Sequence, residues 1–212
     1  MSSTSTAAFW QEHVLAGPYA SIEESRASLH ARLNAYPKLL ELMPIEYPFQ
    51  TVLDFGCGPG HDVLLMLTLG RVQRVYYADI SRRALEITTH RLELHGLRDR
   101  GIPLELEEGE TPILPRVDQI HCAGVLHHTA NPGAILRAFR KALRPEGVAS
   151  VMIYDGERSE HTQSDVPITR WWRQAELAEL AEAAGFTVEY RGSYACSAPW
   201  RPSCYAACYA LR

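Results

Sequence analysis

The chain has 212 residues, of which 46% are hydrophobic and 22% are charged, and its formal net charge is −4. This composition excludes a disordered or fibrous chain and is typical of one globular domain with a full core. The acidic balance argues against a nucleic-acid partner, because binding to phosphate backbones needs a basic surface.

The sequence carries no sign of export or of membrane insertion. No apolar run reaches the roughly 18–20 residues that a membrane-spanning helix needs, and the start, MSSTSTAAF, lacks the basic segment and apolar core of a signal peptide. The five cysteines are odd in number and have no framework spacing, which favours reduced thiols. We therefore expect a cytoplasmic protein without a metal site. Cys57 and His61 supply only two of the four ligands that zinc prefers.

The N-terminal part is predicted to be helical. The first eight residues are expected to lack order, and a helix is expected over 22–36, introduced by Ser21 with Glu24 three residues later, a capping-box pattern. Three prolines between 37 and 48 then interrupt the chain. We expect residues 1–48 to form a helical lid segment and residues 49–212 to form the main domain.

Strands and helices alternate in the main domain. Strands are predicted at 51–55, 72–79, 102–107, 117–124 and 147–155, with helices at 61–69, 82–95 and 132–143. Short apolar strands separated by helices predict a parallel sheet covered on both faces. A helix at 174–184 precedes two strands, 186–194 and 203–211, which should pair antiparallel because the connection is too short for a parallel crossover. The fold class is therefore α/β, a doubly wound sheet of seven mostly parallel strands with a C-terminal antiparallel hairpin.

A glycine-rich loop follows the first strand of the main domain. Gly56, Gly58 and Gly60 lie between Asp54 and the next helix, and Asp79 ends the second strand. Bare backbone at this point lets a ligand approach closely, and an acid at Asp79 can accept hydrogen bonds from ribose hydroxyls. The alternatives are purely structural: the glycines could form a tight turn, and Asp79 could cap the following helix.

The loop differs from a dinucleotide fingerprint. It reads G-x-G-x-G rather than G-x-G-x-x-G, and Asp54 precedes it by two residues. A buried carboxylate here would repel a pyrophosphate, whereas it can order the loop amides or meet an ammonium group. The pattern therefore favours a nucleoside with an amino-acid tail over one with phosphates.

Several motifs in order resemble the class I S-adenosylmethionine-dependent methyltransferases over about residues 50–212. They are VLDFGCGPG (52–60), YYADIS (76–81), GETPILP (109–115), VDQIHCAGVLHHTANP (117–132), FRKALRPEG (139–147) and LAEAAGFTVE (180–189). The resemblance implies S-adenosylmethionine as cofactor and methyl transfer by in-line displacement. The acidic balance and the small additions beyond the core favour a small molecule, or a small group on a metabolite or peptide, as the acceptor.

The resemblance also implies which residues bind the cofactor. Asp79 would bind the ribose, Ile80 would lie under the adenine, and Glu110 would contact the adenine amine with Thr111 beside it. Gly124 corresponds to the position where the backbone passes the methionine portion. Glu110 also has a plain alternative, a solvated face among neighbouring acids.

Six further residues are candidates around the same pocket. His127 and His128 follow the fourth strand, and either could accept the proton that the acceptor loses, although the pair could equally be loop architecture. His61 could help hold the cofactor carboxylate or face solvent, Cys57 is a small filler within the loop, and Tyr19 could reach over the cofactor from the N-terminal segment. Residues 156–172 are the second lid candidate, and Asp155 before them could orient the acceptor.

Two functions of other classes stay open at this point. One is an oxidoreductase with a nucleotide cofactor, and the other is a binding protein on a methyltransferase fold without turnover. The sequence does not indicate the oligomeric state or the acceptor atom.

Overall fold

The computed structural model describes residues 5–45, 51–69, 72–160, 165–196 and 204–212. Its helices of α type are α1 (Thr6–Glu12), α2 (Ile22–Ala35), α3 (Leu39–Leu42), α4 (His61–Thr68), α5 (Arg82–Leu94), α6 (Pro132–Ala142) and α7 (Gln174–Ala183). Short 3₁₀ turns are η1 (Arg98–Arg100) and η2 (Leu126–His128). The strands are β1 (Thr51–Phe55), β2 (Arg74–Asp79), β3 (Gly101–Glu105), β4 (Val117–Ala123), β5 (Leu143–Tyr154), β6 (Val188–Cys196) and β7 (Cys204–Leu211).

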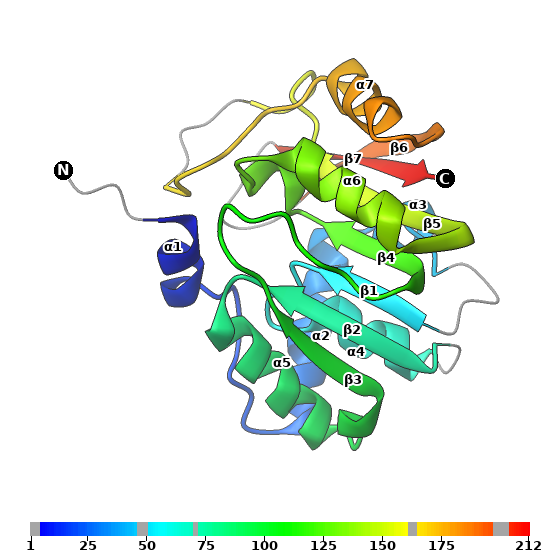
Figure 1. Ribbon diagram of the computed structural model, residues 1–212. Coiled ribbons are helices and arrows are strands. Elements are labelled where there is room, and N and C mark those ends of the chain that lie inside the picture. The colour runs from blue at the N-terminus through cyan, green and yellow to red at the C-terminus, as the bar shows by residue number, and fades with distance from the viewer. Residues whose placement is uncertain (1–4, 46–50, 70–71, 161–164, 197–203) are drawn as a thin grey trace.

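The strands form one sheet in the order β3-β2-β1-β4-β5-β7-β6 (Figure 1). β1 to β5 are mutually parallel, and β7 pairs antiparallel with both β5 and β6. The predicted fold class and the terminal hairpin are confirmed. Strand order reverses between β1 and β4, and ligands of open α/β sheets bind at such a switch point.

Alternation along the strands divides the core into two layers. On β1, Leu53 and Phe55 join the cluster under α6 and α7, whereas Val52 joins the cluster under α4 and α5. On β5, Val151 belongs to the first face and Met152 to the other, where it packs with α3. Because successive side chains along a strand point to opposite faces, both faces of the sheet are buried, as is typical of parallel sheets covered by helices.

Local caps fix several helix ends as the sequence predicts. The Ser21 hydroxyl accepts the amide hydrogen of Glu24 at 3.2 Å, and Asn131 caps α6 in the same way at 3.1 Å. The Glu24 carboxylate, however, accepts from the Ala20 amide rather than from Ser21, so the predicted capping box is only half formed.

α1 was not expected from the sequence. Residues 1–8 are predicted to lack order, and of these 1–4 lie outside the described residues; α1 nevertheless begins at Thr6 beside the sheet (Figure 1), and its Gln11 accepts the amide hydrogen of Arg83 on α5. Ser5 caps it by accepting the Ala8 amide, and Glu108 and Ser81, far along the chain, bind Thr6 and Gln11. Among the described residues, no helix is long and apolar enough to span a membrane.

Candidate functional site

Two adjoining cavities lie where β1, β2, β4 and β5 end. The first cavity has a volume of about 250 Å³ and runs from α1 along the ends of β1, β2 and β4. The second cavity has a volume of about 740 Å³ and lies between α1, α2, the glycine loop and the end of β5. Seven residues border both cavities: Trp10, Leu15, Gly56, Gly58, Ala123, Gly124 and His128.

The glycines of the loop serve different purposes. Gly58 has φ +51°, and a Cβ placed on it would meet no atom within 4 Å, so its bare backbone faces open space at the cavities. Gly60, with φ +73°, begins α4, and a Cβ there would lie 2.7 Å from the Thr88 hydroxyl oxygen on α5. Gly58 therefore leaves room for a ligand, whereas Gly60 lets α4 and α5 pack closely.

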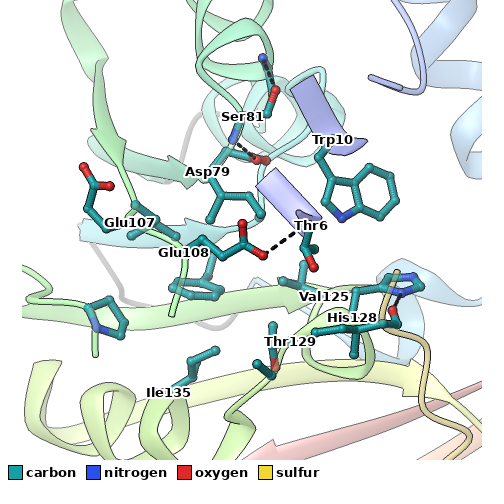
Figure 2. A pocket seen from close by; sticks show the side chains of 18 of the residues that line it. Thr6, Trp10, Asp79, Ser81, Glu107, Glu108, Val125, His128, Thr129 and Ile135 are labelled. Carbon is teal, nitrogen blue, oxygen red and sulfur yellow. Dashed lines mark hydrogen bonds between the residues drawn. The ribbon is translucent and has the colours of Figure 1, made fainter. Parts of the chain in front are cut away.

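Asp79 holds the loop and faces the first cavity (Figure 2). Its carboxylate is 8% exposed and accepts amide hydrogens from Gly58 and Ser81, each at 2.9 Å. Burial raises the pKa of Asp79. Ser81 caps α5 through its own hydroxyl, so Asp79 is not the cap of that helix. A carboxylate offers about four acceptor positions, and two of those on Asp79 are used by the backbone.

α1 forms a wall of the first cavity. The Glu108 carboxylate accepts the amide hydrogens of Thr6 at 2.8 Å and Ala7 at 3.1 Å, and the Gln11 side-chain oxygen accepts from the Ser81 hydroxyl at 3.3 Å. Trp10 stands at the cavity beside these contacts (Figure 2). Sequence reasoning missed these residues. Ser5 ahead of a run of helix formers was the one local signal for α1.

A buried charge cluster lies under the loop. The Asp62 carboxylate accepts from Arg32 Nη2 at 3.1 Å and lies 3.3 Å from His121 Nε2. Burial alone would raise the pKa of Asp62, but Arg32 and His121 outweigh it and hold that pKa well below its usual value. Asp54 pairs with His121 in the β1–β4 register, and burial raises its pKa to about 7.

The structure separates the two histidines. His127 is fully buried, its Nδ1 accepts from the Tyr154 amide at 3.4 Å, and it lines neither cavity. His128 borders both cavities, and its Nδ1 lies 2.8 Å from the Ile168 carbonyl oxygen. A carbonyl can only accept, so this contact assigns the proton of neutral His128 to Nδ1 and leaves the basic lone pair on Nε2. Of the predicted pair, His128 alone has the position of a proton acceptor.

Tyr19 does not reach the cavities. Its hydroxyl accepts from Arg91 Nη1 at 3.1 Å, and the same guanidinium donates to the Pro59 carbonyl at 3.0 Å and to the Ser25 hydroxyl at 2.9 Å. Arg91 is completely buried. The Tyr19 expectation is therefore corrected: this residue helps anchor the N-terminal segment to the glycine loop instead of covering a ligand.

The other predicted residues fall into three sets. Those bordering the first cavity alone are Asp79, Ile80, Glu110 and Thr111. Cys57 and His61 border the second cavity. Asp54 and Gly60 line neither, because Asp54 is buried beneath the loop and Gly60 packs on α5. Asp155 also borders neither cavity; its oxygens accept from the Glu157 amide at 3.1 Å and the Ser193 hydroxyl at 2.9 Å.

A family model described as "Methyltransferase domain" matches residues 26–190, which is more than half of the chain. The chain belongs to this methyltransferase family. The family and the fold class predicted from the sequence are thereby confirmed. The competing oxidoreductase hypothesis loses its basis.

Similar proteins agree with this assignment. A probable cobalt-precorrin-6B C(15)-methyltransferase (decarboxylating) from Methanothermobacter thermautotrophicus is 38% identical over 96 residues, covering 45% of this chain and 47% of the relative. A ubiquinone biosynthesis O-methyltransferase from Paraburkholderia xenovorans is 33% identical over 103 residues, covering 46% and 41%. The chain thus spans less than half the length of these curated relatives.

Among solved structures, a methyltransferase in complex with the Haloferax volcanii activator Trm112 superposes with a TM-score of 0.71. The two chains are 16% identical, and the match covers 95% of this chain and 96% of the other. At this identity the likeness concerns the fold.

Proposed function

We propose that this methyltransferase transfers the methyl group of S-adenosylmethionine to a small-molecule acceptor. The observation that carries the proposal is the open strip of backbone at Gly58 and Gly124, where the first and second cavities meet. Both glycines have positive φ; a Cβ on Gly58 would meet no atom within 4 Å, and a Cβ on Gly124 would meet Met152 Cε at 3.8 Å, an ordinary contact distance. Such a strip fits a donor in one cavity and an acceptor in the other.

The first cavity fits the nucleoside part of the cofactor. Asp79 would accept hydrogen bonds from the ribose hydroxyls at its remaining acceptor positions, and Ile80 offers an apolar surface to the adenine. Glu110 and Thr111 border the same cavity and would contact the adenine edge. When bound, S-adenosylmethionine supplies a methyl group activated by a sulfonium.

The residues of this chain would position the acceptor, exclude water and receive a proton. His128 borders both cavities, and its Nε2 would take the proton that a hydroxyl or amine loses. α1 covers the site on one side. The segment after β5 covers another, where the Arg170 amide donates to the His127 carbonyl at 2.8 Å. We assign the lid role predicted for 1–48 and 156–172 to the described parts of these ranges, 5–45, 156–160 and 165–172.

Several features favour a small acceptor. The second cavity, at about 740 Å³, lies in the size range of sites for metabolites and drug-sized molecules. The chain carries a net charge of −4, which disfavours a polyanionic acceptor.

Calorimetric titration tests the proposal directly. S-adenosylhomocysteine, the demethylated product, should bind the purified protein, whereas NADH and FAD should give no heat. Release of S-adenosylhomocysteine in the presence of candidate acceptors would then distinguish an enzyme from a binding protein that retains only the fold. Binding of NADH in place of S-adenosylhomocysteine would refute the proposal.

A further inference from the structure

A continuous row of aromatic rings runs from α1 to the segment after β5. We call it the aromatic wall, and its members in spatial order are Phe9, Trp10, His128, His127, Tyr154 and Trp171. Successive ring centroids lie 5.2, 5.5, 4.3, 3.8 and 5.5 Å apart. These are the separations of interacting aromatic pairs.

Four members of the wall border the second cavity: Phe9, Trp10, His128 and Tyr154. α2 contributes Tyr36 to the same cavity, together with the small side chains of Ala31 and Ala35. Rings on several elements therefore line the cavity, where Tyr154 already stacks with His127 and Trp171, and Phe9 with His13. A flat aromatic molecule can add to this set of rings. A saturated, puckered molecule of the same size would contact the rings less completely.

The charges around the cavity are almost compensated. Arg32 is paired with Asp62 at 3.1 Å and lies 4.0 Å above the Tyr36 ring, so its guanidinium is already engaged. His61 is neutral at pH 7, since burial lowers its pKa to about 3. Asp165, the other acidic residue among the described lining residues, is exposed. The cavity therefore disfavours an anionic acceptor.

We infer that the second cavity binds a neutral, planar aromatic acceptor and holds its hydroxyl group at His128. This inference rests on the proposed function and specifies its acceptor. The phenolic oxygen forms a bond to the transferred methyl carbon while the carbon–sulfur bond breaks, and that electron pair stays on sulfur. The phenolic proton passes to Nε2 of His128. Products are the aryl methyl ether, the neutral thioether and a protonated His128, which balances the charge of the sulfonium.

The test compares three acceptor probes by calorimetry on protein saturated with S-adenosylhomocysteine. 2-Naphthol is planar and neutral, decahydro-2-naphthol is its saturated counterpart, and 6-hydroxy-2-naphthoate carries a carboxylate. We expect 2-naphthol to bind at least about tenfold more tightly than each of the other two probes. The saturated probe loses aromatic contacts with the wall, and the naphthoate has to bury a charge.

Substitutions in the aromatic wall test whether it causes the preference for 2-naphthol. Tyr154→Leu and Phe9→Leu should each weaken 2-naphthol binding by about three- to tenfold, and Tyr154→Phe should retain it. Tyr190→Leu is the matched control, because Tyr190 is 44% exposed on β6 and borders neither cavity. Phe9 lies on the partly exposed α1, so its variant serves if Tyr154→Leu does not fold.

The outcomes separate the two proposals. Failure of S-adenosylhomocysteine to bind overturns the proposed function, and this inference with it. Normal S-adenosylhomocysteine binding, with equal affinity for 2-naphthol and its saturated counterpart or with a preference for the naphthoate, overturns the acceptor class alone.

Discussion

The glycine loop allows a ligand effect to be measured separately from a folding effect. Gly58→Ala places a methyl group at a residue with φ +51° and with no atom within 4 Å of the new Cβ. Gly96→Ala is a matched control, since Gly96 has φ +66°, is equally open, and borders neither cavity. Both variants carry the same left-handed strain, about 1–2 kcal/mol, and little else.

The expected changes in melting temperature follow from the similar strain in Gly58→Ala and Gly96→Ala. Each variant alone should lower the melting temperature by about 2–8 °C, because 1 kcal/mol corresponds to about 2–4 °C in a chain of this size. S-adenosylhomocysteine at about 100 times its dissociation constant should stabilise the wild type and Gly96→Ala by about 2.7 kcal/mol, or about 5–10 °C. Gly58→Ala should lose most of this shift, because its methyl group occupies the strip where the cofactor approaches the backbone.

Differential scanning fluorimetry with and without S-adenosylhomocysteine provides the measurement. Circular dichroism checks that both variants are folded before the ligand is added. If Gly58→Ala keeps the full ligand-induced shift shown by Gly96→Ala, the reasoning that Gly58 faces the cofactor is refuted.

Three further predictions concern the network around the site. Arg91→Met removes the donor to the buried Pro59 carbonyl and one hydrogen bond of the Tyr19 hydroxyl, and it should destabilise the protein by at least about 3 kcal/mol in urea unfolding. The exposed Arg82→Met should change stability by less than about 0.5 kcal/mol. His61, with its pKa lowered to about 3, binds a proton in the unfolded chain below pH 6.5 but not in the folded one, so its contribution to stability falls as the pH drops from about 6.5 toward 3. His61→Gln should therefore lose less stability than the wild type between pH 7 and pH 4, and identical slopes would contradict the assignment. Glu108→Ala removes the acceptor for the first amides of α1 and should increase hydrogen exchange in residues 6–12 with α4 unaffected, as measured by mass spectrometry.

The sequence alone was sufficient for the architecture. Periodicity and turn residues located every strand to within a few residues, because the alternation that buries both faces is a local property of β1 to β5. The glycine loop and Asp79 were also found, since their spacing along the chain reflects the switch point itself.

Contacts between distant segments were not predictable in this way. α1 is held by Glu108 and Ser81, about 100 and 70 residues away along the chain, and no local pattern encodes such pairing. The two adjacent histidines looked equivalent, yet backbone partners turn His127 into the core and His128 to the cavities. Tyr19 was misassigned for the same reason, because its partner Arg91 lies 72 residues further on.

The border shared by the two cavities has a thermodynamic consequence. Trp10, Gly58 and His128 would contact whatever occupies either side, so a molecule seated on one side alters the surface offered to the other. By linkage, donor and acceptor must then alter each other's affinity by one common factor, whichever arrives first.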